Sequence, residues 1–204
     1  MDRFRKMLPV CLAASGAVLF AGAVAGQTPA KATQPGTDGR LERGRYLVTI
    51  LGCNDCHTPF KMGPQGPEPD MSRMLSGHPE SMKLPPPPAP AGPWIWAGSA
   101  SNTAYAGPWG VSYASNLTPD QNTGLGIWTE DMFLKMMKTG KHMGVSREVQ
   151  PPMPWPWYGK AEDEDLKSVF AYLKSIPPIV NHVPDWQPPA PAKAAPKEPA
   201  PAKK

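Results

Sequence analysis

Five consecutive residues, Cys53-Asn54-Asp55-Cys56-His57, form the clearest chemical pattern in this chain of 204 residues. Two thiols three positions apart can each form a thioether with a vinyl group of one porphyrin. The imidazole that follows them is placed to ligate an iron at the centre of that porphyrin. The pattern C-x-x-C-H therefore predicts covalent attachment of a c-type haem through Cys53 and Cys56, with His57 as an iron ligand.

Two other uses of a C-x-x-C pair are less consistent with the chain. A dithiol redox pair is typical of a βαβ setting, which the sequence does not indicate. A structural zinc site requires a second, closely spaced pair of ligands. The remaining histidines, His78, His142 and His182, are isolated from one another. Haem attachment is therefore favoured over both alternatives.

The N-terminus has the features of an export signal. Basic residues at Arg3, Arg5 and Lys6 precede an apolar stretch, 8–25, that ends in small residues. This pattern predicts a signal peptide over residues 1–26, in preference to a retained membrane anchor. We expect a periplasmic protein, which would be membrane-anchored if the signal were not cleaved.

The number of cysteines limits the covalent chemistry of the exported chain. Of the three cysteines, Cys11 lies in the expected signal peptide, which leaves Cys53 and Cys56. Both are required for the haem, so no structural disulfide is expected. The single C-x-x-C-H predicts one haem c, whose apolar surface would serve as the centre of the core.

The formal net charge of +4 comes from the two ends of the chain. Residues 27–38 are expected to be a linker, and the Pro/Ala/Lys-rich residues 187–204 a disordered tail. The body between them, 39–186, is close to neutral and carries no basic stripe. The basic pI of the chain is therefore no argument for a nucleic-acid interface on the folded body. Membrane contact through an uncleaved signal or the basic tail remains open.

Apolar periodicity predicts three helices, at about 39–52, 129–140 and 163–176, and no comparable strand pattern is present. We therefore expect an all-α single domain around one covalent haem. Residues 58–128 are expected to form a long irregular insertion rich in Pro, Gly and Trp. Its aromatic residues, Trp94, Trp96 and Trp109, are expected to pack inward.

A sixth iron ligand is expected downstream of the motif. Met153 stands between prolines, which stiffen the backbone and suit a fixed thioether ligand. The other candidates are Met143, His142, His78 and His182. Two tryptophans, Trp128 and Trp155, are expected to contact the haem or its propionates, with ordinary core packing as the alternative.

At this level of detail the chain resembles a known family. The motifs that carry the resemblance are Asn116-Leu117-Thr118-Pro119-Asp120, 123–130, Pro152-Met153-Pro154-Trp155, Asp163-Glu164-Asp165-Leu166 and Ala171-Tyr172-Leu173. The order of a helix, C-x-x-C-H, a loop, a helix, a Met-bearing Pro loop and a closing helix resembles that of class I c-type cytochromes and implies a class I cytochrome c-like fold. The motifs are similar to the cytochrome c domains in the electron-accepting subunits of bacterial membrane-associated dehydrogenases. The resemblance implies that His57 is the proximal ligand, that Met153 is the distal ligand, and that the first and last helices cross near Gly44. Those subunits often carry three haem domains, whereas this chain has one motif, which favours a single-haem carrier or small subunit.

The expected function is electron transfer and not catalysis. An iron ligated by His57 and Met153 has no open position and cycles between two oxidation states. The expected partners are a dehydrogenase as donor and an oxidase or another cytochrome as acceptor. Membership of a dehydrogenase complex, as one of its subunits, is an alternative to a free carrier. The alternative is a haem enzyme or a gas or redox sensor, which would require an open or displaceable sixth ligand.

Overall fold

The computed structural model describes residues 36–87 and 93–189. The expected signal peptide, 1–26, lies outside the described residues, as do most of the expected linker and most of the expected tail.

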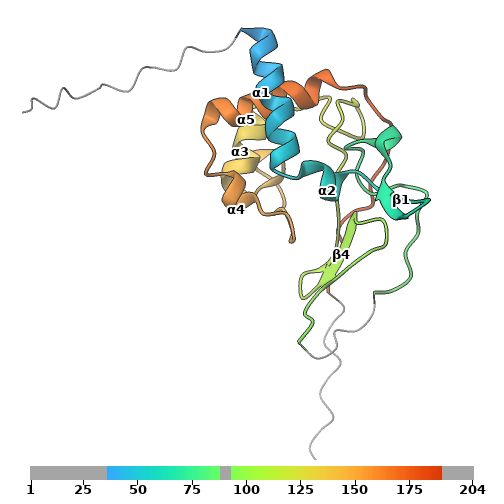
Figure 1. The fold of residues 1–204 in the computed structure, drawn as a ribbon. Helices are drawn as coiled ribbons and strands as arrows, with labels where there is room; N and C mark the ends of the chain where they lie inside the picture. Colours follow the sequence, from blue (N-terminus) through green and yellow to red (C-terminus); the bar gives the residue numbers. More distant parts are fainter. Residues whose placement is uncertain (1–35, 88–92, 190–204) are drawn as a thin grey trace, which may run out of the picture. The chain divides into compact units, whose positions relative to one another are not determined.

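Three helices surround the apolar core: α1 (Thr37–Ile50), α3 (Glu130–Thr139) and α5 (Asp163–Ser175) (Figure 1). They confirm the three helices expected from the sequence. The Thr129 side chain accepts a hydrogen bond from the backbone N–H of Met132 at 3.2 Å, and Gly140 ends α3 in the left-handed region. These are a common N-cap and C-cap, which is why local sequence defined this helix well.

The first and last helices pack directly on each other. Gly44 of α1 lies against the backbone of Ser168 in α5, with no room for a side chain between them. This close approach confirms the crossing near Gly44 that the family resemblance implied. The core around the crossing is built from large apolar side chains of all three helices, among them Leu47, Val48, Phe133, Met136, Met137, Leu166, Val169, Phe170 and Leu173.

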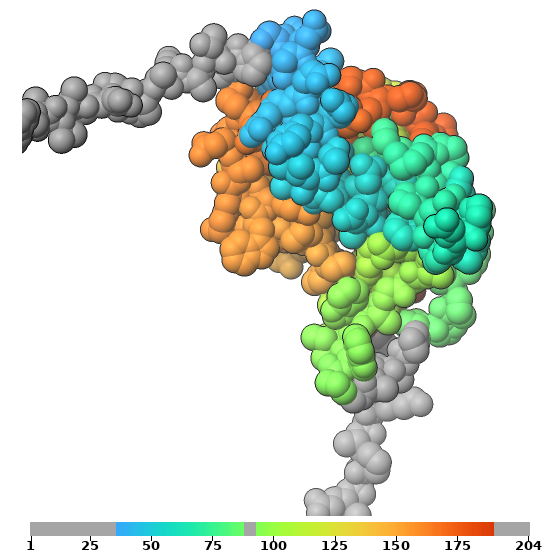
Figure 2. Space-filling view, viewed as in Figure 1, coloured from blue at the N-terminus to red at the C-terminus, as the bar shows by residue number. Residues whose placement is uncertain are grey.

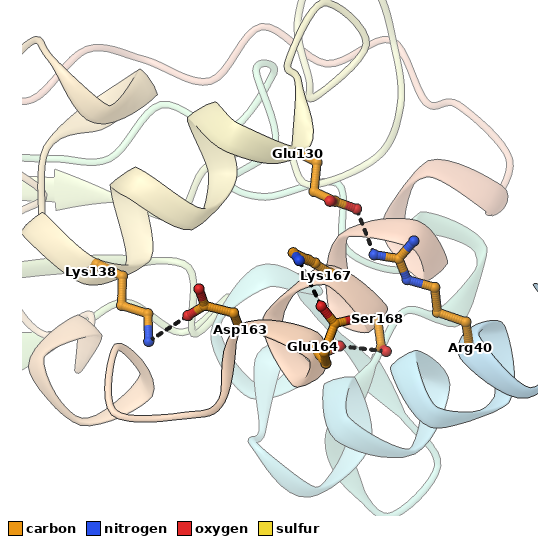
Figure 3. Close-up of polar contacts among 7 residues, drawn as sticks. All are labelled: Arg40, Glu130, Lys138, Asp163, Glu164, Lys167 and Ser168. Atoms are coloured by element: carbon orange, nitrogen blue, oxygen red, sulfur yellow. Dashed lines mark hydrogen bonds and ion pairs between the residues drawn. The ribbon is translucent and has the colours of Figure 1, made fainter. Parts of the chain in front are cut away.

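Ion pairs connect the same three helices at the surface (Figure 3). Arg40 of α1 contacts Glu130 of α3 at 2.6 Å, and Lys138 of α3 contacts Asp163 of α5 at 3.1 Å. Because these pairs are partly exposed to water, each contributes about 0–1 kcal/mol. The buried apolar contacts therefore dominate the stability of the helix packing.

The expectation of an all-α fold is wrong. Two antiparallel sheets are present, and the described chain is 35% helix and 14% strand, so the fold is mixed α/β. The first sheet pairs β1 (Phe60–Gly63) with β2 (Gly66–Pro69), and the second has the order β3 (Ala97–Gly98), β4 (Ala104–Gly107), β5 (Gly110–Tyr113).

The sequence pattern did not predict the strands, because they are short and rich in Gly, Ala and Pro. No alternation of apolar and polar residues develops over two to four positions. Each hairpin turns through two residues between paired glycines, Gly63 with Gly66 and Gly107 with Gly110. All five strands lie in the stretch 58–128 that was expected to be irregular.

The aromatic residues of that stretch are not uniformly packed inward. Trp94 is 75% exposed and Trp96 is 47% exposed, so the expectation is wrong for these two. Trp109 is partly buried, and its indole N–H donates to Ser112 Oγ at 3.2 Å.

Short helices complete the elements: α2 (Cys53–His57), η1 (Met71–Arg73), η2 (His142–Gly144) and α4 (Trp155–Tyr158). The surface of α1, in blue, lies beside an orange surface from later in the chain (Figure 2). The hydroxyl of Tyr158, in α4, donates to the carbonyl of Leu51, the residue after α1, at 2.5 Å. Within the described residues, no helix combines the length and apolar character needed to span a membrane.

After α5 the chain returns along the second sheet. Gln187 and Val111 of β5 exchange two backbone hydrogen bonds, at 2.8 and 2.9 Å. The indole N–H of Trp186 donates to the Trp109 carbonyl at 2.7 Å. The chain is thus fixed against β5 up to Gln187, the first residue of the expected tail. Residues 182–186, just before it, contribute one wall of the cavity described next.

Candidate haem site

A cavity of about 300 Å³ lies where the end of α1, α2, the second sheet, α3, α5 and the Met153 loop come together. Five of the six site residues that the sequence favoured line this cavity: Cys53, Cys56, His57, Trp128 and Met153. Its walls are mostly apolar, with Leu117, Leu125, Phe133, Met136, Val169 and Leu173 among the lining side chains. The tertiary structure therefore brings together groups that are up to a hundred positions apart in the sequence.

The C-x-x-C-H motif itself forms the one-turn helix α2. Gly52 adopts a left-handed conformation, with φ of 67°, which ends α1 and redirects the chain into α2. Helical spacing places residues three and four positions apart on one face. The two thiols and the imidazole consequently line the same cavity, while Asp55 is exposed.

His57 is oriented by a backbone group from a distant segment. Its Nδ1 lies 2.7 Å from the carbonyl oxygen of Ser115, which can only accept, so Nδ1 carries the proton. Nε2 then carries the lone pair, and no hydrogen bond joins it to any described residue. Burial lowers the pKa of the His57 imidazole, which favours the neutral form. A metal-ligating histidine commonly has this arrangement, with its other ring nitrogen donating to a carbonyl.

The two cysteines are free thiols and are not bridged to each other. Burial raises the pKa of the Cys53 thiol to about 11, so it is a neutral thiol at neutral pH. A thiol of this kind is a poor match for a reactive dithiol pair, which requires a lowered pKa. Among residues 36–87 and 93–189, no group of three or more His, Cys, Asp or Glu side chains is arranged to hold a metal ion, so the donor set does not fit a structural zinc site.

Met153 is partly buried and lines the same cavity as His57. Its loop is fixed by Ser112 of β5, whose hydroxyl donates to the Pro151 carbonyl at 2.5 Å. Met143, the other methionine considered as a ligand, packs against the apolar core and does not line the cavity.

The three other histidines fall into two groups. His78 is fully buried, with its ring nitrogens bonded to Thr103 Oγ1 at 2.9 Å and the Met82 carbonyl at 3.0 Å, and it does not line the cavity. His142 and His182 both line the cavity. They therefore remain alternatives to Met153 as a sixth ligand.

The two tryptophans differ in their positions. Trp128 is buried and lines the cavity, where its ring and the His142 ring make a T-shaped contact with centroids 5.0 Å apart. Trp155 does not line the cavity and instead packs over Gly140 at the end of α3.

Sequence reasoning missed several groups that shape the site. The Ser115 carbonyl has no sequence signal, because any residue offers a backbone oxygen. Arg147 and Tyr105 also line the cavity, and neither belongs to a recognisable pattern. Burial and a contact with Cys56 raise the pKa of the Tyr105 hydroxyl, which keeps that group neutral.

Taken together, these donors fit a covalently attached haem. Cys53 and Cys56 would hold its vinyl groups, Nε2 of His57 would hold its iron, and the apolar walls suit the porphyrin ring. A second ligand is available from Met153 on the wall of the same cavity.

Comparison with known proteins agrees with this assignment, although no protein-family model matches the chain. The cytochrome c subunit of a quinone alcohol dehydrogenase from Gluconacetobacter polyoxogenes is 31% identical over 148 residues, which is 71% of this chain and 26% of that protein. The fructose dehydrogenase cytochrome subunit of Gluconobacter japonicus is 27% identical over 165 residues, 80% of this chain and 26% of that protein.

A third relative, the gluconate 2-dehydrogenase cytochrome c subunit of Pantoea cypripedii, is 27% identical over 151 residues, which is 74% of this chain and 26% of that protein. The chain thus spans about a quarter of the length of these relatives. Their similarity extends over most of this chain. The chain is a relative of the cytochrome c subunits of bacterial dehydrogenases, and it contains a cytochrome c domain.

Proposed function

We propose that this protein is an exported mono-haem c-type cytochrome that transfers single electrons between redox proteins. Cys53 and Cys56 hold the haem by thioethers, and His57 and Met153 ligate its iron. The observation that carries the proposal is that His57, fixed by the Ser115 carbonyl, and Met153 line one apolar cavity. The single C-x-x-C-H in the sequence supports one haem.

Haem bound in this cavity supplies a one-electron Fe(II)/Fe(III) couple. The chain's own residues set the conditions for that couple. The apolar wall excludes water, which favours the less charged, reduced form and raises the potential. The Ser115 carbonyl orients the His57 ring, and Ser112 fixes the loop that carries Met153, so that neither ligand has to move between oxidation states.

The proposed donor is a dehydrogenase, and the proposed acceptor is an oxidase or another cytochrome. The names of the relatives, which are cytochrome subunits of alcohol, fructose and gluconate dehydrogenases, support the donor class. The basic and apolar N-terminus supports a periplasmic location for a domain of about residues 39–186.

Absorption spectra of the purified holoprotein test the ligand assignment. The wild type is expected to be low-spin and to show the weak near-infrared band of an Fe–S(Met) bond, and Met153→Ala is expected to lose that band. Met143→Ala is the matched control, because Met143 does not line the cavity. A Met153→Ala variant with an unchanged spectrum would place the sixth ligand elsewhere, with His142 and His182 as the next candidates. A high-spin ferric wild type would instead support the enzyme or sensor alternative.

A further inference from the structure

Tyr105 of β4 connects the cavity with the surface of the second sheet. Its side chain is 6% exposed, lines the cavity and contacts the side chain of Cys56. Its ring also makes an edge contact with the ring of Trp96, with centroids 6.0 Å apart. Trp96 does not line the cavity and is 47% exposed. Two aromatic side chains in contact therefore lead from the protein surface to Cys56, one of the two proposed attachment points of the haem.

The turn between β3 and β4 fixes Tyr105 relative to the C-x-x-C-H helix α2, which lies beside β4 in Figure 1. Asn102 in this turn adopts a left-handed conformation, with φ of 53°, which asparagine tolerates better than most residues. Its side-chain amide donates to the Asp55 carbonyl at 2.6 Å, and its own carbonyl accepts from the Tyr105 hydroxyl at 2.6 Å. The contact of Tyr105 with Cys56 is thus held by hydrogen bonds on both sides of Asn102.

The surface at Trp96 is apolar and uncharged. Trp94 and Ile95 beside it are 75% and 63% exposed, and the sequence from 84 to 119 contains no Asp, Glu, Lys, Arg or His. Removing water from such a surface costs much less than removing it from charged groups. A redox protein can therefore approach Trp96 closely, which matters because the rate of electron tunnelling falls steeply with distance.

Electrons tunnel more readily through atoms in contact than across a gap. We propose that Trp96 and Tyr105 form an electron-transfer route between the surface of the second sheet and the haem, through the thioether at Cys56. This inference rests on the proposed function, because it requires a haem attached to Cys56. In each transfer, one electron passes from the reduced donor to Fe(III), which leaves an oxidised donor and Fe(II). Neither aromatic ring is oxidised on the way, and no proton moves.

Flash photolysis of a covalently attached tris(bipyridine)ruthenium label measures this route in the holoprotein. Both thiols of the C-x-x-C-H motif would be in thioethers, so a single introduced cysteine takes the label. Ile95→Cys places the label beside Trp96. Ile127→Cys is the control site, because Ile127 is equally exposed, at 62%, and precedes Trp128 of the cavity wall. After a soluble quencher has photo-oxidised the label, Ru(III) takes one electron from Fe(II), and the haem absorption gives the rate.

With the label at position 95, Trp96→Leu is expected to slow the transfer several-fold, and Tyr105→Leu to slow it as well. Trp96→Phe, which keeps an aromatic ring, is expected to recover most of the rate. With the label at position 127, Trp96→Leu is expected to leave the rate unchanged. The midpoint potential should also stay the same in Trp96→Leu, because Trp96 does not line the cavity.

The two label sites separate a local route from a general effect on the haem. An unchanged rate at position 95 in Trp96→Leu, or an equal slowing at positions 95 and 127, would overturn the inference while the proposed function stands. A wild type without covalent haem would overturn the proposed function itself.

Discussion

Gly44 of α1 lies against the carbonyl oxygen of Ser168 in α5, so closely that any side chain at Gly44 would overlap that oxygen. Both residues lie inside regular α-helices, so this backbone contact sets the distance between the two helix axes. Leu47 and Val48 on α1, together with Leu166 and Val169 on α5, are buried around it. The position of α1 matters for the site, since α1 leads directly into the C-x-x-C-H motif.

Replacing Gly44 by Ala is expected to destabilise the holoprotein by about 1–3 kcal/mol or more, because the helices must separate to admit the methyl group. Urea unfolding monitored by circular dichroism measures this loss. Gly36→Ala is the control, since nothing lies within 4 Å of a Cβ at Gly36, the N-cap of α1. Equal losses in both variants would contradict the close packing at Gly44.

Asn181 is expected to be the most sensitive polar residue outside the cavity wall. Its buried amide donates to the carbonyls of Ser76 and His78, at 2.7 and 2.9 Å, and accepts from Arg73 and from the Glu80 N–H. Asn181→Ala leaves two carbonyls, one backbone N–H and one guanidinium N–H without this partner, which should cost about 2–4 kcal/mol. The exposed Gln65 in the β1–β2 turn provides a control, and Gln65→Ala is expected to change the unfolding free energy by less than about 0.5 kcal/mol.

The free energy of unfolding is expected to decrease as the pH is lowered from neutral, in part because of His78. Burial lowers the pKa of the His78 imidazole from its ordinary value of 6.5, and the charge of Lys83 lowers it further, while a hydrogen bond to Met82 opposes them. The unfolded chain therefore binds a proton more readily than the folded chain. The stability that neutral, buried His78 contributes is therefore fully present above pH 6.5. It is lost as the pH falls through the lower pKa that His78 has in the folded protein.

Denaturant unfolding of the wild type and His78→Gln between pH 5 and 8 measures that dependence. The variant is expected to show a smaller increase of unfolding free energy with pH. Some increase should remain, because burial also lowers the pKa of His142. An identical slope in the two proteins would show that His78 does not titrate as its burial implies.

The hydroxyl of Ser112 is expected to limit the motion of the loop that carries Met153. It donates to the Pro151 carbonyl and accepts from the Trp109 indole. Ser112→Ala should remove a bond worth about 1 kcal/mol and lower the temperature at which the Fe–S(Met) near-infrared band disappears. Ser175→Ala, at the exposed end of α5, is the matched control. If the band of Ser112→Ala disappeared at the same temperature as that of the wild type, Ser112 would not anchor the loop.

The parts of the fold that follow from neighbouring residues were accessible from the sequence. The helix at Glu130–Thr139 is defined by Thr129 at its start, Gly140 at its end and an apolar face between them. The C-x-x-C-H motif was also recognisable, because its chemistry depends on spacing within five residues. The strands were missed because Gly107 and Gly110, or Gly63 and Gly66, pair without any periodic pattern.

The sequence by itself determined the haem motif, the three helices and a short set of candidate ligands. Only the tertiary structure decided that the fold is mixed α/β, that Met153 and not Met143 lines the cavity, and that Ser115 orients His57. The physical reason is separation along the chain. His57 and Ser115 are 58 positions apart, and a backbone carbonyl leaves no trace in residue type, so their hydrogen bond exists only after the chain has folded.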